Sequence, residues 1–368
     1  MKGKYLPGSL FVCSFFLLFL TACDFFPQFR TDQTNTPVSQ VPTEVSESSS
    51  QTLRYAAAHS SKRNILIGTA ANMDAFNTDA TYKKLLGQEF NLLTPENVLK
   101  MDTIHPDIDT FDFSKSDQLV AFAEAHHMQI EGSSIIWHDQ IPDWITHGGY
   151  TRQELLGILK DYIQTVVGHY KGKIKSWFVV NEPLETSFWE QMLGPDYITN
   201  AFRWTHEADP QAKLYVNEYG IEMPGTKTNR YYHLVQELIS QGVPVSGVGS
   251  QSHLNLTRAY NLSQMIANLQ RFADLGVQVE ITEVDVRTQN LTASMAEKLK
   301  QEARLYAMMI STCQAVKACD GIVIWGITDR YTWINSGTHG TDVPLIFDDQ
   351  YRPKAAYYAV QNALLGKQ

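Results

Sequence analysis

Glu182 and Glu283 are the two residues whose type and position most clearly indicate chemistry. Each comes at the end of a largely apolar run, 175–180 for Glu182 and 277–281 for Glu283. Two carboxylates that face each other across a substrate suit hydrolysis of a glycosidic bond, because one can protonate the leaving oxygen while the other acts at the anomeric carbon. A lone glutamate would mean little, since it usually stabilises the N-terminus of the next helix. The prediction therefore depends on the residues around the pair.

Polar and aromatic residues also follow most of the other apolar runs. In chain order they are Glu96, Asn97 and Lys100, Trp137 and His138, Asn181, Gln251 and His253, Asp285, and Trp325 and Trp333. If the runs are parallel strands, these side chains meet at one end of a sheet and form a polar cleft with aromatic walls. The flat faces of the three tryptophans would suit sugar rings, although each tryptophan alone would more often belong to a core.

Alternating strand-like and helix-like segments would position these residues. Short apolar runs predict eight strands, at 64–70, 90–93, 128–137, 175–180, 213–216, 247–251, 277–281 and 321–325. Residues 151–170 and 262–275 repeat apolar residues with the period of a helix. Eight such units predict a (β/α)8 TIM barrel that forms a single catalytic domain, with Glu182 and Glu283 on opposite sides of its mouth. The alternative is an open doubly wound sheet, but the sequence has no glycine-rich nucleotide motif to support it.

The N-terminus predicts export. Two lysines, Lys2 and Lys4, precede the apolar run 10–20, which is too short for a membrane span of about 20 residues and fits a signal peptide. The next residues, Leu20-Thr21-Ala22-Cys23, resemble a bacterial lipobox, which implies a signal peptide over 1–22 and a lipid on Cys23. The alternative is an ordinary secretory signal with an incidental cysteine.

A polar segment separates this signal from the rest of the chain. Residues 23–55 begin with the lipidated Cys23, are rich in Ser, Thr and Pro, and predict a flexible tether. Residues 56–368 would then form the glycoside hydrolase domain. We therefore expect an exported protein that a lipid holds at the cell membrane or cell surface.

The composition excludes several classes of protein. Apolar residues make up 43% of the 368 residues, which is typical of a globular chain and not of a disordered or multi-span membrane protein. The formal charge of −9 argues against a nucleic-acid partner. His126 and His127 have no further ligands at metal-binding spacing, so we expect no metal, and we also expect no cofactor. We expect a monomer.

The order of these motifs resembles glycoside hydrolase family 10, the xylanase-type retaining enzymes on a (β/α)8 barrel. The segments that carry the resemblance are Leu93–Lys100 (LTPENVLK), Ile136–Trp144 (IWHDQIPDW), Trp177–Pro183 (WFVVNEP), Gly247–His253 (GVGSQSH), Ile281–Asp285 (ITEVD), Gly321–Trp333 (GIVIWGITDRYTW), Pro344–Asp348 and Pro353–Tyr357. The resemblance runs from about residue 60 to the end of the chain. It implies a retaining endo-β-1,4-xylanase that acts on xylan or xylo-oligosaccharides.

The resemblance also implies a role for each site residue. Glu182 would be the acid/base and Glu283 the nucleophile, while Asn181 would bind the 2-hydroxyl of the sugar that is cleaved. His253 and Asp285 would keep Glu283 ionised and oriented. The residues expected to bind substrate are Glu96, Asn97, Lys100, Trp137, His138, Gln251, Trp325 and Trp333.

Two further features follow from the same resemblance. Cys313 and Cys319 resemble a disulfide of many family members, with two reduced thiols as the alternative. Ser133 stands where the family commonly has a histidine that touches the sugar at the cleavage site. This departure leaves two alternatives to a xylanase open, a glycosidase of the same fold that acts on another β-linked glycan and a glycan-binding lipoprotein without catalysis.

Overall fold

A computed structural model describes residues 52–60, 62–289, 291–335 and 342–367. The chain divides into two units, Met1–Glu44 and Val45–Gln368, and every described residue belongs to the second. The predicted signal peptide, Cys23 and most of the predicted tether lie outside the described residues. Within the described ranges, no helix combines the length and the apolar character that a membrane crossing requires.

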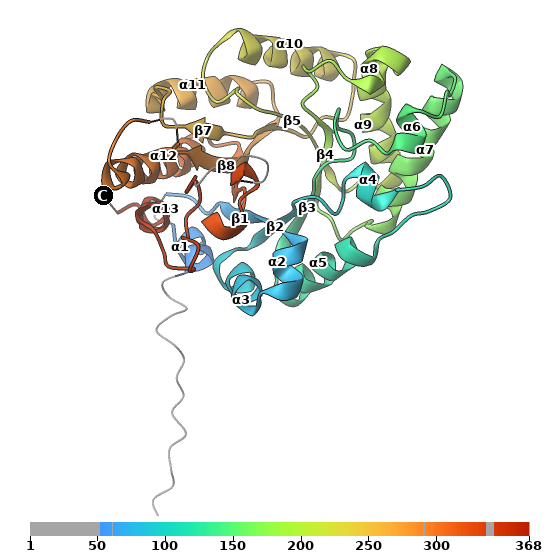
Figure 1. Cartoon of the computed structure of the whole chain (residues 1–368). Coiled ribbons are helices and arrows are strands. Elements are labelled where there is room, and N and C mark those ends of the chain that lie inside the picture. Colours follow the sequence, from blue (N-terminus) through green and yellow to red (C-terminus); the bar gives the residue numbers. More distant parts are fainter. Residues whose placement is uncertain (1–51, 61, 290, 336–341, 368) are drawn as a thin grey trace, which may run out of the picture. The chain divides into compact units, whose positions relative to one another are not determined.

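A closed ring of parallel strands forms the centre of this unit (Figure 1). The strands are β1 (Leu66–Ala71), β2 (Leu92–Pro95), β3 (Gln129–Gly132), β4 (Ser176–Asn181), β5 (Lys213–Glu218), β6 (Gly247–Ser250), β7 (His253–Asn255), β8 (Gln278–Arg287) and β9 (Cys319–Ile324). Neighbouring strands pair in the order β1, β2, β3, β4, β5, β6, β8, β9, and β9 pairs with β1 to close the ring. The predicted (β/α)8 barrel is therefore confirmed.

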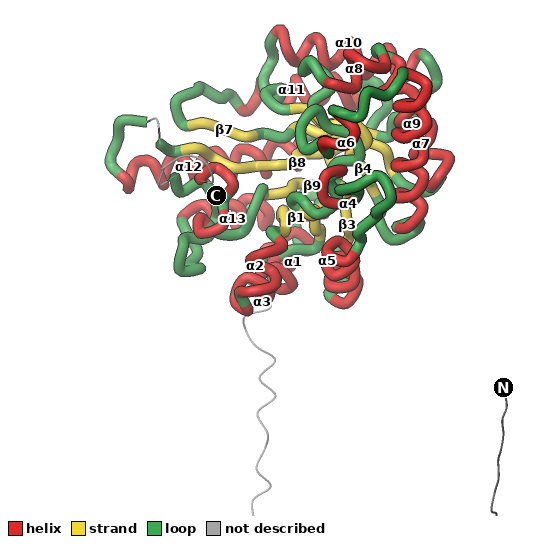
Figure 2. Tube along the Cα trace, turned by 45° about the vertical axis from the view of Figure 1, so that its right-hand side comes forward, coloured by secondary structure: helices red, strands yellow, loops and turns green. Residues whose placement is uncertain are grey.

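Helices surround the ring and connect its strands (Figure 2). They are α1 (Leu53–Ala58), α2 (Met73–Thr78), α3 (Ala80–Glu89), α4 (Met101–Ile104), α5 (Ser114–Ala125), α6 (Asp143–Thr146), α7 (Arg152–His169), α8 (Phe188–Leu193), α9 (Asp196–Ala208), α10 (Thr226–Ser240), α11 (Leu262–Ala273), α12 (Met295–Ala315) and α13 (Ala355–Leu365), with 3-10 turns at Asp329–Tyr331 and Trp333–Asn335. The core lies between the ring and these helices, as the alternating pattern requires.

Helix α7 illustrates how the sequence specifies these elements. Thr151 caps its first turn, and Glu154 hydrogen-bonds back to the Thr151 N–H at 2.8 Å, which makes a capping box. Leu155, Leu159 and Ile163 repeat at helical spacing and are buried. The helix therefore begins and packs where the sequence predicts.

The structure adds to the predicted strands in one region. Strand β8 continues past residue 281 to Arg287, and the short strand β7 pairs with this extension, His253 against Asp285 and Asn255 against Arg287. Charged residues, Glu283 and Asp285, alternate with apolar ones in this extension, whereas the predicted run ended at Ile281. Three residues are too few for β7 to show a period in the sequence.

The start of the folded domain needs a correction. The predicted tether extended to residue 55, but Leu53, Arg54 and Tyr55 belong to α1. Leu53 is fully buried, and its N–H donates to the Glu89 carboxylate at 2.9 Å. Apolar burial and this hydrogen bond hold the segment in the fold, although its polar surroundings in the sequence resemble a linker.

The predicted pair of cysteines forms a disulfide. Cys313 near the end of α12 is bonded to Cys319 at the start of β9, with 5.2 Å between their Cα atoms. Both residues are buried. The bond closes the short connection into the last strand of the ring.

Candidate active site

A cleft of about 800 Å³ lies at the carboxyl ends of the ring strands. The residues that line it are Glu96, Asn97, Lys100, Ser133, Trp137, Asp139, Gln140, Asn181, Glu182, Tyr219, Gly220, Gln251, His253, Asn255, Arg258, Glu283, Arg287, Trp325 and Trp333. Active sites of such barrels lie at this end. The cleft thus brings together most of the residues that the sequence singles out.

Glu182 directly follows β4, whose six residues are all buried. Its backbone is left-handed, with a φ of 55°, and its N–H donates to the Asn217 carbonyl at 2.8 Å. Such a conformation costs a residue with a side chain about 1–2 kcal/mol, so the surrounding structure must hold it. The Glu182 carboxylate accepts hydrogen bonds from Trp137 Nε1 and Gln251 Nε2, each at 2.9 Å.

Glu283 lies within β8 and is 6% exposed. Its Oε1 accepts a hydrogen bond from Asn217 Nδ2 at 2.7 Å, and its Oε2 lies 3.2 Å from His253 Nε2. Both oxygens therefore face nitrogen atoms that can donate. These contacts fix the orientation of the carboxylate in the cleft.

His253 connects Glu283 to a second buried carboxylate. Its Nδ1 lies 2.8 Å from Asp285 Oδ2, and Trp333 Nε1 donates to the same oxygen at 2.8 Å. Burial disfavours a charged imidazole, but the charges of Asp285 and Glu283 and their hydrogen bonds outweigh it and raise the pKa of His253 to about 10. At neutral pH an imidazolium therefore lies between the two carboxylates. Asp285 is fully buried behind the cleft and does not line it.

Amide side chains join the two glutamates. Asn181 Oδ1 accepts hydrogen bonds from Gln251 Nε2 at 3.2 Å and from Asn217 Nδ2 at 2.9 Å. Because Gln251 also donates to Glu182 and Asn217 also donates to Glu283, one continuous network runs from one carboxylate to the other.

The sequence analysis gave Asn217 no role. Asn217 directly follows the fifth apolar run, 213–216, as Asn181 follows the fourth. This position is the signal that could have identified Asn217 as a site residue. Its Oδ1 accepts from Thr282 Oγ1 at 2.7 Å, which orients the amide. Gly249 on the neighbouring strand leaves space for this side chain, since a Cβ there would collide with Asn217 Oδ1.

The residues after β2 form the opposite wall of the cleft. Asn72 donates to Glu96 Oε2 at 2.8 Å, and Lys100 Nζ donates to Asn97 Oδ1 at 3.1 Å. Burial raises the pKa of Glu96 against the effect of Asn72 and Lys100. Burial also lowers the pKa of Lys100, against the opposing charges of Glu283 and Glu96. This wall can present both a cation and hydrogen-bond acceptors to a substrate.

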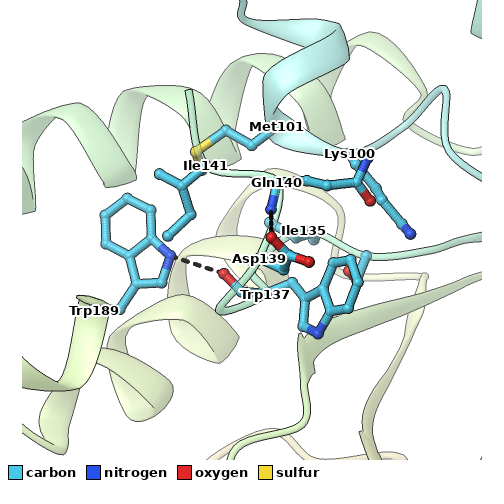
Figure 3. Close-up of a pocket in the computed structure, with 9 residues that line it drawn as sticks. Lys100, Met101, Ile135, Trp137, Asp139, Gln140, Ile141 and Trp189 are labelled. Carbon is cyan, nitrogen blue, oxygen red and sulfur yellow. Dashed lines mark hydrogen bonds between the residues drawn. The ribbon is translucent and has the colours of Figure 1, made fainter. Parts of the chain in front are cut away.

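The tryptophans do not contribute equally to the cleft surface. Trp137 lies beneath Lys100, whose Nζ is 4.4 Å from its ring centroid. Figure 3 shows the loop that carries Trp137, with buried Trp189 donating from Nε1 to the Trp137 carbonyl at 3.1 Å. Trp333 is 36% exposed and Trp325 is 8% exposed, so Trp333 offers the more open face.

His138 was predicted to bind substrate, and Ser133 stands where the family commonly has a histidine that touches the sugar. His138 does not line the cleft; its Nδ1 lies 3.4 Å from Glu182 Oε2. Its neighbour Trp137 takes the cleft-facing position instead. Ser133 lines the cleft and is 3% exposed.

Among the described residues, no group of three or more histidines, cysteines or acidic residues could hold a metal ion.

Residues 55–363 match the family described as Glycosyl hydrolase family 10. The chain belongs to glycosyl hydrolase family 10. The family 10 match begins inside α1 and includes every predicted site residue of the barrel, from Glu96 to Trp333.

Relatives within family 10 cover most of the chain. It is 39% identical to "Endo-1,4-beta-xylanase B" of Thermotoga neapolitana over 82% of this chain and 89% of the relative. It is 38% identical to "Beta-1,4-xylanase" of Dictyoglomus thermophilum over 76% and 83%. A solved structure of xylanase 10B from Thermotoga petrophila RKU-1 in complex with xylobiose is 42% identical, with a TM-score of 0.81 over 85% of this chain and 97% of that one.

Proposed function

We propose that this family 10 protein is a retaining endo-1,4-β-xylanase in which Glu182 is the acid/base and Glu283 the nucleophile. The observation that carries the proposal is that both carboxylates line one cleft and are joined by the network of Gln251, Asn181 and Asn217. The xylanases to which the chain is similar support xylan as the substrate class.

The neighbours of the two carboxylates support these roles. Glu283 lies beside the imidazole of His253, whose Nε2 is 3.2 Å from its Oε2 and orients the carboxylate in the cleft. Hydrogen bonds to Glu182 come from the neutral side chains of Trp137 and Gln251, and the imidazole Nδ1 of His138 lies 3.4 Å from its Oε2. A group that must give and take a proton in one cycle benefits from neighbours that do not fix its charge.

In the first step, a Glu283 oxygen forms a bond to the anomeric carbon of a xylose unit as the bond from that carbon to the bridging oxygen breaks. Glu182 gives its proton to the departing oxygen, so the leaving chain departs as a neutral sugar. The product is a covalent ester between Glu283 and the sugar. Glu182 is then a carboxylate.

In the second step, Glu182 takes a proton from a water molecule as the water oxygen bonds to the anomeric carbon. The ester bond to Glu283 breaks, and Glu283 recovers its negative charge. Two inversions give a product with the configuration of the substrate. The cycle leaves both glutamates in their starting states.

The remaining cleft residues would hold the sugar chain. Asn181 would hydrogen-bond the 2-hydroxyl of the sugar that is cleaved, a contact that strengthens in the transition state. Glu96, Asn97 and Lys100 would bind the next sugar on the non-reducing side. Gln251, Trp137, Trp325 and Trp333 would line the cleavage site, whereas His138 would act through Glu182 and not on the sugar.

Product analysis tests this proposal. Wild-type protein should release reducing sugar from xylan and little or none from carboxymethyl-cellulose. Proton NMR of the first product should show the β-anomer before mutarotation. An α-configured first product would contradict the retaining mechanism, and binding of xylan without turnover would favour a glycan-binding protein.

Ser133 gives specific support to a second candidate, a broader specificity for β-linked glycans. A serine at this buried cleft position leaves more space than a histidine and provides a different hydrogen-bonding group. The ratio of kcat/KM for aryl β-xylobioside over aryl β-cellobioside should rise in Ser133→His if this space admits glucose. An unchanged ratio would remove the support for the second candidate.

We also propose that the enzyme is exported and anchored by a lipid on Cys23. The apolar run 10–20, the lipobox-like sequence and the Ser/Thr/Pro-rich segment support this, and a disulfide is compatible with an oxidising compartment. Full-length protein expressed in a bacterial host should incorporate labelled palmitate and sediment with membranes. Cys23→Ala should lose both properties, and label retained in that variant would contradict the assignment.

Size-exclusion chromatography with light scattering of the released domain should show a monomer.

A further inference from the structure

One rim of the cleft carries two guanidinium groups that the catalytic steps do not use. Asn255, Arg258 and Arg287 form this arginine rim, and all three line the cleft. Asn255 pairs with Arg287 in the register of β7 and β8, and the Arg258 N–H donates to the Asn255 carbonyl at 3.0 Å. The three residues therefore belong to one local structure.

The ring order places the arginine rim across the barrel mouth from Glu96, Asn97 and Lys100. Strands β2 and β6 are separated by three intervening strands in either direction around the ring, so they lie opposite each other. Glu96 follows β2, while Asn255 and Arg258 follow β6. A sugar chain that extends from Glu96 past the two catalytic glutamates would reach the arginine rim on its leaving-group side.

The charge of this rim is only partly balanced by the protein. Arg287 Cζ lies 5.0 Å from the ring centroid of Trp333, and Arg287 forms no ion pair within the described part of the chain. Arg258 has one ion pair there, with Glu222 at 3.9 Å, and its side chain is 60% exposed. Glu222 itself is almost fully buried, so this long ion pair leaves the Arg258 guanidinium largely exposed to the cleft and solvent.

Guanidinium groups suit one class of sugar substituent. Their planar donors match the two oxygens of a carboxylate, whereas a plain xylose chain offers only neutral hydroxyls and ring oxygens. Contact with the Trp333 ring limits the movement of the Arg287 guanidinium and does not use the hydrogen-bond donors of the guanidinium. An acidic substituent beside this rim would contact the guanidinium groups of Arg258 and Arg287, whereas the middle of the cleft is rich in carboxylates.

We propose that the arginine rim recognises a uronic-acid branch on the xylan chain, on the leaving-group side of the cleavage site. The inference rests on the proposed xylanase activity and adds the chemistry of the branch that the cleft selects. Arg287 and Arg258 are specificity-determining residues in this account, and neither takes part in bond cleavage.

Three matched substrates test the proposal: a linear xylo-oligosaccharide, the same chain with one glucuronic-acid branch, and the branched chain with its carboxyl group reduced to an alcohol. Wild-type kcat/KM should be higher for the acidic branch than for its reduced form. The Arg258→Gln/Arg287→Gln variant should lower that ratio by about threefold to tenfold. Raising sodium chloride from 20 mM to 500 mM should also lower the wild-type ratio.

Arg203→Gln on α9 is the matched control, because Arg203 is exposed and does not line the cleft. It should leave the ratio unchanged. Equal losses on all three substrates in the double variant would overturn the proposal, as would a wild-type ratio of one. No turnover of the linear chain by wild-type protein would instead contradict the xylanase activity itself, so the two failures are distinguishable.

Discussion

The surroundings of Glu283 and Glu182 differ in charge and in how they are fixed. Glu283 contacts a cation, His253, which is held by buried Asp285, and Asp285 in turn accepts from Trp333. Glu182 accepts hydrogen bonds from the neutral side chains of Trp137 and Gln251, lies near the imidazole of His138 and has a left-handed backbone. A nucleophile that must remain ionised and an acid that must change its charge need different neighbours, and the barrel provides them at β4 and β8, which are separated by β5 and β6 in the ring.

Removing Glu283 should have the largest effect. Glu283→Ala should lower kcat on xylan by about 10⁴-fold or more, because the glycosyl ester of the proposed first step forms on this carboxylate. The loss should be similar for an aryl xylobioside with a good leaving group, since the missing bond is needed for either substrate. Steady-state kinetics on both substrates checks this, and recovery on the aryl substrate without added nucleophile would contradict the role of Glu283.

Removing Glu182 should have an effect that depends on the leaving group. Glu182→Ala should lower kcat/KM on xylan by about 10²- to 10⁴-fold. On a dinitrophenyl xylobioside the loss should be much smaller, because that leaving group departs without a proton. Stopped-flow measurement should then show a burst of dinitrophenol, as the second step still lacks its base. An equal loss on both substrates would oppose the acid/base role.

Asn217→Ala should reduce kcat less than either glutamate change. A lost hydrogen bond to a charged group corresponds to about 1.5–3 kcal/mol, or a decrease of about tenfold to 150-fold. Thr282→Val is the matched comparison, because it removes only the hydroxyl that orients Asn217. Thr282→Val should lower kcat by about fivefold. Kinetics below the unfolding temperature of each variant test the order, and a larger loss in Thr282→Val would contradict it.

The charge of His253 should appear as a pH dependence of stability. The folded-state pKa of about 10 is above the unfolded value of about 6.5, so the stabilisation is complete below about pH 6.5 and is lost as pH rises toward 10. The difference in unfolding free energy between wild type and His253→Gln should therefore shrink over this range. Denaturant titrations from pH 6 to pH 10 measure it. A difference that stays constant would show that folding does not raise the pKa of His253.

The sequence predicts the strands and the two catalytic glutamates better than the hydrogen bonds that join the site residues. Each catalytic glutamate follows a buried apolar run, and the eight runs predict the ring that brings Glu182 and Glu283 to one cleft. The role of Asn217 could not be predicted in this way, since its partners Asn181 and Glu283 are 36 and 66 residues away. Which side chains meet across strands depends on the register of the ring, which local patterns do not determine.

The limits of local sequence patterns also explain why the structure differs from the prediction at other positions. Leu53 lies in polar sequence, and only its buried contacts in the fold identify it as part of the domain. Whether Trp137 or His138 points into the cleft depends on the backbone conformation of the loop after β3, and residue type alone does not predict it. The arginine rim is assembled from the ends of β7 and β8, and no pattern in the sequence predicts the short strand β7.

The most direct test of the two roles is the configuration of azide products from Glu182→Ala and Glu283→Ala. Each variant is given a dinitrophenyl β-xylobioside with sodium azide, and the products are analysed by NMR. In Glu182→Ala, azide should attack the glycosyl ester on Glu283 and give a β-glycosyl azide. In Glu283→Ala, azide should occupy the space of the missing carboxylate and give an α-glycosyl azide. The same anomer from both variants, or the reverse pairing, would contradict the assignment of acid/base and nucleophile.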